Sequence, residues 1–202
     1  MKPRALRKAL MAFYLIVILA MAWLVGYPVA VKSEPRAAPA DPCALVPADL
    51  VALLVPAPGK PEPEVRNNQP FTNRAECAIR TDHDAATTNA SASLRIEVER
   101  NGSRGTESSS SHSQTDFANG KRYEMQDSIV QHRVNDLRGI GDSAYLTVDV
   151  PRSSGSGSAA AQVTVLRGDI IATVMYSASP SSDEQVAAAA VRVARELVKA
   201  VR

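Results

Sequence analysis

The chain has 202 residues, with 23 Lys and Arg against 21 Asp and Glu and a formal net charge of +2 at pH 7. Five of the basic residues precede residue 33, so the rest of the chain has 18 basic and 21 acidic residues, a net charge of about −3. This mildly acidic balance excludes nucleic acid as a partner held by charge, and two cysteines are too few for a cysteine-rich metal centre.

The first 40 residues predict a membrane anchor followed by a linker. Residues 1–8 form a basic tail, residues 9–31 contain no charged side chain, and residues 32–40 are rich in Pro and Ala. A helix over 9–31 would be about 34 Å long, enough to cross a hydrocarbon core of about 30 Å. The basic flank stays in the cytoplasm under the positive-inside rule. We therefore expect a single-pass protein of the cell membrane, with its N-terminus cytoplasmic and residues 41–202 forming one extracytoplasmic domain.

A cleaved secretory signal is the alternative to the anchor. Ala38-Pro39-Ala40 has the small-x-small form that signal peptidase accepts, and cleavage there would release a chain that begins at Asp41. An uncharged run of 23 residues is longer than the apolar region of most signal peptides, which favours the anchor.

Cys43 and Cys77 both fall in the predicted exported part, where thiols oxidise and stay oxidised. A disulfide between them would close a loop of about 35 residues, which the chain-entropy argument values at about 4 kcal/mol. A metal or redox site would need more ligands or a closely spaced pair of cysteines. We predict a structural disulfide.

The first half of the exported part predicts one short helix and two strands. Residues 47–54 have a Pro in the first turn and leucines on one side, which indicates a helix. Four prolines between residues 56 and 63 exclude a regular element until about residue 70. A strand follows at 77–80, and the clearest strand is 93–100, where Leu94, Ile96 and Val98 alternate with charged residues.

The second half predicts further strands and a final helix. Residues 102–113 and 153–158 read as flexible loops, 115–125 as a short helix, and 134–142 as a turn leading into a strand at 144–148. Strands at 161–166 and 169–177 are joined by a hairpin at Gly168. Ser182 and Gln185 form a capping-box pattern at the start of an amphipathic helix that runs to the end of the chain. We therefore expect an α+β fold in which the C-terminal helix packs on an antiparallel sheet of four or five strands.

Several motifs resemble a family of small exported actinobacterial proteins, many of them lipoproteins, known as a domain of unknown function. The segment from Asp41-Pro42-Cys43 to Leu50 resembles the opening of that family, and Cys77 looks like its second cysteine. The stretch from Arg138 to Tyr145 is similar to its Gly-Leu-Gly-Asp-x-Ala turn. The resemblance covers most of residues 41–201 and implies an envelope location, but it implies no activity because the family has none assigned.

No motif for catalysis, metal binding or a cofactor stands out, and we expect none of these. His83, His112 and His132 are too scattered for a helical or hairpin metal pair. Asp82-His83-Asp84 could orient an imidazole beside a serine, but the nucleophile elbow of serine hydrolases is absent.

Two classes of function stay open. The first is a non-catalytic binding module of the bacterial envelope, with a protein, a glycan or a small apolar molecule as its ligand and its binding surface on loops. The alternative is an envelope hydrolase whose residues converge only in the folded chain. Arg138 and Asp142 are the charged groups most firmly placed for binding, although Asp142 equally suits a turn residue that accepts backbone N–H bonds.

Overall fold

The structure, a computed structural model, describes residues 35–66, 71–87, 89–126, 132–149 and 157–201. Among these residues, no helix has the length and hydropathy needed to cross a bilayer. The predicted anchor at 9–31 and the basic tail at 1–8 lie outside them. The elements run in the order η1 (Cys43–Leu45), α2 (Ala48–Leu54), β1 (Glu62–Arg66), β2 (Thr72–Arg80), β3 (Ser91–Asn101), α3 (Ser109–Gln126), β4 (His132–Leu137), β5 (Ser143–Asp149), β6 (Ala159–Arg167), β7 (Ile170–Ser179) and α4 (Asp183–Ala200).

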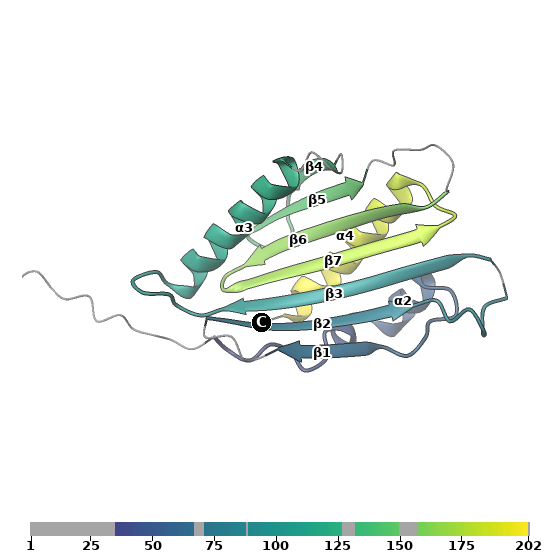
Figure 1. Ribbon diagram of the computed structural model, residues 1–202, viewed down its shortest axis with the longest axis horizontal. Coiled ribbons are helices and arrows are strands. Elements are labelled where there is room, and N and C mark those ends of the chain that lie inside the picture. Colours follow the sequence, from purple (N-terminus) through teal and green to yellow (C-terminus); the bar gives the residue numbers. More distant parts are fainter. Residues whose placement is uncertain (1–34, 67–70, 88, 127–131, 150–156, 202) are drawn as a thin grey trace, which may run out of the picture. The chain divides into compact units, whose positions relative to one another are not determined.

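Within the described residues, seven strands form one antiparallel sheet in the order β1-β2-β3-β7-β6-β5-β4 (Figure 1). The chain builds one half of the sheet with β1 to β3, crosses through α3 to the far edge at β4, and returns strand by strand to β7 beside β3. This arrangement confirms the predicted α+β class with an antiparallel sheet and a C-terminal helix. The predicted number of four or five strands is wrong.

The two strands that the sequence did not indicate lie at the edges of the sheet. β1 is exposed along its whole length and contains Pro63, and β4 consists mainly of polar residues. An edge strand pairs on one side only, so it tolerates proline and needs no apolar face. The alternation that marks an interior strand is therefore missing at both edges.

One face of the sheet is apolar and is covered by α4 and α2, which lie behind the sheet in Figure 1. Leu94, Val163 and Val174 of the sheet are fully buried, as are Val186 and Leu197 of α4. Burying each such side chain contributes about 1.5 to 3 kcal/mol. The start of α4 carries the predicted capping box, in which Ser182 Oγ accepts from the Gln185 N–H and Gln185 Oε1 accepts from the Ser182 N–H.

The opposite face of the sheet is polar, and α3 lies on it in front of the sheet in Figure 1. The ring of Phe117 on α3 packs against the ring of Tyr145 on β5, with centroids 5.2 Å apart. α3 is longer than the predicted helix at 115–125, because it begins at Ser109 inside the stretch read as a loop. Its first turn is buried at His112 and Ser113, which explains why a serine-rich segment is helical there.

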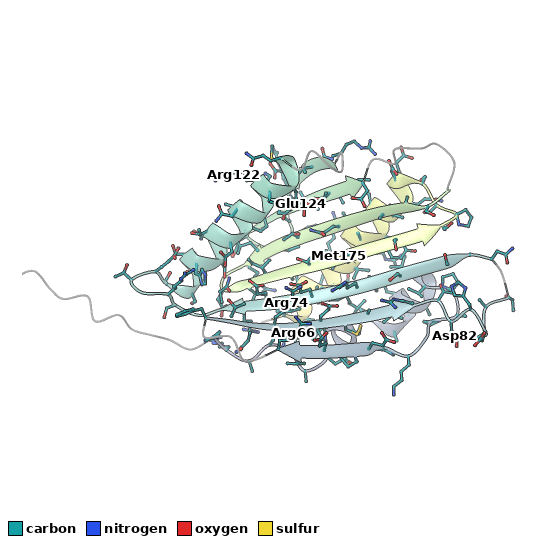
Figure 2. All side chains as sticks on the ribbon, in the orientation of Figure 1. Arg66, Arg74, Asp82, Arg122, Glu124 and Met175 are labelled. Atoms are coloured by element: carbon teal, nitrogen blue, oxygen red, sulfur yellow. A yellow bond between two sulfur atoms is a disulfide. The ribbon has the colours of Figure 1, made fainter. Side chains whose placement is uncertain are left out.

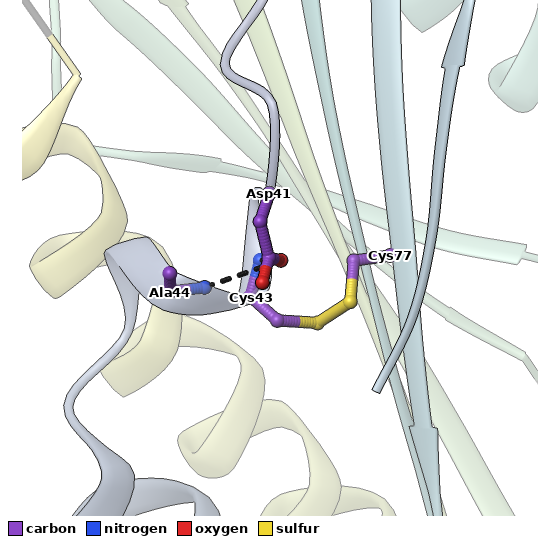
Figure 3. Close-up of a disulfide and its surroundings, with 4 residues drawn as sticks. All are labelled: Asp41, Cys43, Ala44 and Cys77. Carbon is purple, nitrogen blue, oxygen red and sulfur yellow. Dashed lines mark hydrogen bonds between the residues drawn. A yellow bond between two sulfur atoms is a disulfide. The ribbon is translucent and has the colours of Figure 1, made fainter. Parts of the chain in front are cut away.

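Cys43 and Cys77 form the predicted disulfide, with their Cα atoms 5.7 Å apart (Figure 3). The bond joins η1 to β2, and both cysteines are buried. Asp41 fixes the turn on the N-terminal side of the bridge, because its Oδ1 accepts from the N–H groups of Cys43 at 2.9 Å and Ala44 at 3.4 Å. The bridge thereby holds the start of the domain against the second strand.

The last residues of the predicted linker lie against the domain. Asn73 of β2 donates its side-chain N–H groups to the carbonyl oxygens of Pro35 and Arg36, at 3.0 and 3.1 Å. Ala38 is buried. The packed domain therefore begins several residues before Asp41.

Candidate binding groove

A groove lies between the second half of α3 and the polar face of the sheet. Its volume is about 410 Å³, within the range of about 300 to 1,000 Å³ usual for small-molecule sites. Figure 2 labels two of the residues that line it, Glu124 on α3 and Met175 on β7. Further lining residues include Ser93, Arg95, Tyr123, Thr147, Gln162 and Ser177.

The floor of the groove is made of side chains from four adjacent strands. Thr147 of β5 is the register partner of Gln162 of β6, and Met175 of β7 lies between Gln162 and Arg95 of β3. A parallel row contains Ser177 with Ser93 and Ala160 on either side. Because neighbouring strands are about 4.8 Å apart, the row of four side chains from Thr147 to Arg95 spans about 14 Å.

Arg95, the cation in the floor of the groove, is neutralised by a carboxylate of the same sheet. Arg95 pairs with Glu76 of β2 at 2.7 Å. Arg74, labelled in Figure 2, continues the network by pairing with Glu97 at 2.5 Å. Burial raises the pKa of Glu97, while Arg74 opposes that rise. The charges of these four side chains are therefore engaged with one another.

Thr147 has a buried hydroxyl without a hydrogen-bond partner. Its residue is 3% exposed, and Oγ1 bonds to no other group in the part of the chain that the structure describes. Nearly all buried polar side chains in folded proteins have a partner, so an orphaned hydroxyl needs a reason. Here it belongs to a residue that lines the groove.

The start of α3 is fixed to the sheet by polar contacts rather than by an apolar stripe. Asn101 at the end of β3 donates to Ser113 Oγ at 3.2 Å and to Asp116 at 3.3 Å. His112 lies 3.1 Å from the Gly102 carbonyl oxygen and 3.3 Å from Asp116. These contacts leave the other end of α3 to form the rim of the groove, where Tyr123 is 72% exposed.

No protein-family model matches this chain. No curated protein matches it either. Among solved structures, the chain is similar to the extracellular domain of PknH from Mycobacterium tuberculosis, with 12% identity and a TM-score of 0.48. That match covers 78% of this chain and 92% of the PknH domain. A likeness at this level assigns neither a family nor a function, and the resemblance to the exported actinobacterial family stays a prediction.

A second, smaller cavity of about 310 Å³ contains His83 of the Asp82-His83-Asp84 motif. Ser91, Ser93 and Ser177 also line it. Within the described residues, no hydrogen bond joins His83 to a serine or a carboxylate, and Asp82 accepts from the backbone N–H of Asp84 at 3.0 Å. The motif therefore forms a local turn, and no triad is assembled. The side chain of His132 lies outside what the structure describes.

The cluster of Asp41, Cys43 and Cys77 brings its ligand-type atoms within 4.8 Å of one another. Both sulfurs are consumed by the disulfide, and the Asp41 carboxylate accepts two backbone N–H bonds (Figure 3). The contacts of this cluster are those of a structural bridge.

Arg138 and Asp142, the charged residues singled out from the sequence, lie at the opposite end of the sheet from the groove. Both are exposed, and both belong to the turn between β4 and β5. The groove residues escaped sequence reasoning because Ser93, Thr147, Gln162 and Met175 are ordinary strand residues with no shared motif. Only the register of four strands brings them together, and the loops that the sequence favoured supply none of these side chains.

Proposed function

We propose that this protein is a membrane-anchored, exported binding module of the bacterial envelope, and that its ligand lies in the groove between α3 and the sheet. The observation that carries the proposal is the buried hydroxyl of Thr147, a residue that lines the groove, which has no hydrogen-bond partner among the described residues. A ligand that bonds to it would remove the desolvation cost of about 1 to 3 kcal/mol that an unsatisfied buried group carries.

Two features support the extracytoplasmic location. The uncharged run at 9–31 with its basic flank is the pattern of a membrane anchor with the basic end inside. The disulfide between Cys43 and Cys77 is stable in an oxidising compartment and is uncommon in a reducing cytoplasm. The resemblance to exported actinobacterial proteins agrees with this location.

The contacts around His83 favour binding over hydrolysis. A hydrolase would need His83 within hydrogen-bond reach of a nucleophile and oriented by a carboxylate. Both contacts are missing among the described residues, whereas the groove is preformed and lined by convergent polar groups. Turnover of an esterase or peptidase substrate that is abolished by His83→Ala would favour the enzyme instead.

Filling the groove tests the proposal. The full-length protein and the variant Ala160→Trp are incubated in detergent with the low-molecular-mass fraction of cell envelope and analysed by native mass spectrometry. Ala78→Trp is the matched control, because Ala78 lies on the same polar face in β2 but outside the groove. We expect wild type and Ala78→Trp to retain a small molecule that Ala160→Trp does not.

Equal retention by all three proteins, or retention by none, would contradict the proposed site. Thermal unfolding of each variant is the folding control: a Tm close to that of the wild type shows that the protein accommodates the introduced indole. Gln162→Ala, which enlarges the groove without adding bulk, serves as a second variant and should weaken retention.

A further inference from the structure

Apart from Arg95, Glu124 and Asp149, which already take part in interactions within the protein, the hydrogen-bonding groups of the groove are uncharged. Its lining includes the hydroxyl-bearing residues Ser93, Ser177 and Thr147 and the amide-bearing Gln162, and the Thr147 hydroxyl itself is buried. Gln162 donates to Thr164 Oγ1 at 3.3 Å, which leaves its carbonyl oxygen and one N–H available. Such a floor offers both hydrogen-bond donors and hydrogen-bond acceptors.

A charged ligand does not suit this groove. The guanidinium of Arg95 is already paired with Glu76. Glu124 and Asp149, the carboxylates that line the groove, also take part in interactions within the protein. An anion would meet two carboxylates, and a cation would meet no carboxylate that lacks a partner.

An apolar chain and an extended peptide do not suit it either. A hydrocarbon chain would cover the floor hydroxyls and the Gln162 amide without replacing their hydrogen bonds to water. Each polar group buried in this way would make binding less favourable in free energy. A peptide that adds to a sheet needs a free strand edge. The floor strands β3, β7, β6 and β5 are all interior, with neighbours on both sides.

The rim adds an aromatic ring. Tyr123 is 72% exposed at the end of α3 and lines the groove, so its ring offers an apolar face above a polar floor. A pyranose or furanose ring has the matching character, with C–H groups on one face and hydroxyls around the edge. Tyrosine suits contacts of this kind because one part of it is apolar and its hydroxyl bonds to water or a partner.

We propose that the groove binds a neutral saccharide, a proposal that rests on the groove being the ligand site. The ring of Tyr123 stacks on one sugar face, and the sugar hydroxyls bond to Gln162, to the serines of the floor and to Thr147 Oγ1. The row of about 14 Å across four strands has room for more than one sugar unit. The saccharide therefore supplies the hydrogen-bond partner that Thr147 Oγ1 lacks among the described residues.

The test uses the full-length protein in detergent and isothermal titration calorimetry. The probes are neutral oligosaccharides of two to six units built from glucose, galactose, mannose, arabinose or N-acetylglucosamine. Glucuronate oligomers, hexadecanoate and a neutral hexapeptide are the comparison probes. We expect at least one neutral oligosaccharide to bind. Tyr123→Ala should weaken it about tenfold and Thr147→Val about fivefold, the size of one lost stacking contact or hydrogen bond.

Thr147→Val separates a binding role from a structural one. Valine has nearly the shape of threonine, and the hydroxyl it removes has no partner in the described protein, so the thermal stability of the free protein should be unchanged or higher. Met125→Ala is the control for Tyr123→Ala, because Met125 is 67% exposed on the same helix but does not line the groove. It should leave the affinity unchanged.

The outcomes distinguish the ligand class from the site. One outcome is that no neutral saccharide binds, while glucuronate oligomers, hexadecanoate or the hexapeptide bind and both Tyr123→Ala and Thr147→Val weaken that binding. This outcome would contradict the proposed ligand class and leave the groove as the binding site. Saccharide binding that neither variant changes would overturn the groove. A Thr147→Val protein that is less stable and binds normally would also overturn the role of this hydroxyl.

Discussion

The carboxylate of Asp142 accepts a hydrogen bond from the backbone N–H of Gly168, with 2.7 Å between Oδ2 and N. The backbone N–H of Asp142 in turn donates to the carbonyl oxygen of Leu166 at 2.8 Å. Asp142 belongs to the turn after β4, and Gly168 lies at the tip of the hairpin between β6 and β7. One side chain therefore joins two turns at the end of the sheet away from the groove, as a turn role for Asp142 requires.

Replacing Asp142 tests whether this role is the whole of its function. Asp142→Ala removes an exposed acceptor and should lower the free energy of unfolding by about 0.5 to 1.5 kcal/mol. Ligand binding in the groove should be unchanged, and Arg138→Ala should alter neither property. Urea unfolding and calorimetry measure both quantities. A binding defect in Asp142→Ala at unchanged stability would instead make this turn part of a binding surface.

The glycines of the same turn provide a matched pair of variants. Gly141 and Gly139 both have positive φ, at +59° and +75°. A Cβ on Gly141 would lie 2.5 Å from the Leu166 carbonyl oxygen, whereas a Cβ on Gly139 would meet nothing within 4 Å. Gly139→Ala should lower the free energy of unfolding by about 1 to 2 kcal/mol through backbone strain alone. Gly141→Ala should lower it by clearly more, because the added Cβ also clashes with Leu166. Equal costs in chemical denaturation would show that the turn relaxes away from β6.

The disulfide should account for a large part of the stability of the domain. Cys43→Ser or Cys77→Ser should lower the free energy of unfolding by about 2 to 5 kcal/mol, because either one frees the loop between η1 and β2. The double variant, with both cysteines replaced by serine, should lower the free energy of unfolding by about as much as either single variant does. Intact-mass measurement without reductant should find no free thiol in the wild type, and two free thiols would refute the bond.

Glu99 should make the domain less stable at neutral pH than in mild acid. Burial, together with Glu97 and Asp116, raises its pKa above the ordinary value of 4.5. A raised pKa in the folded state means that Glu99 favours folding below pH 4.5 and that this contribution is lost as the pH rises through the folded pKa. Glu99→Gln should therefore raise Tm by about 2 to 4 °C at pH 7 for each kcal/mol recovered.

The difference in Tm between Glu99→Gln and wild type should shrink toward zero below pH 4.5, the ordinary value for this carboxyl group. Glu62→Gln, at an exposed position of β1, controls for the change in net charge. A Tm difference that does not vary with pH would show that the amide stabilises the domain by another route.

The location of the protein is tested by fractionation. Residues 9–31 with their basic flank should keep the full-length chain in the membrane fraction. Extraction at alkaline pH should not release it, whereas detergent should. Recovery from the culture medium of a mature chain that begins at Asp41 would show that the segment is a cleaved signal.

The elements that could be predicted are those whose local pattern matches their place in the fold. The run of Leu94, Ile96 and Val98 alternates because β3 is interior with one apolar and one polar face. Ser182 and Gln185 mark the start of α4 because a capping box is a local contact. The groove has no such signal, since Thr147 and Arg95 come to lie at the two ends of one row of side chains only through the order of four strands.

Pro63 makes the β1 edge of the sheet a poor site for pairing with a further strand. It lies in β1 opposite Cys77, and a proline has no N–H to offer a further strand. The remaining side chains of β1 are mostly charged and all are exposed, which discourages another sheet from joining at this edge. The strand that lacks an alternating pattern therefore also opposes the edge-to-edge addition of further copies of this domain.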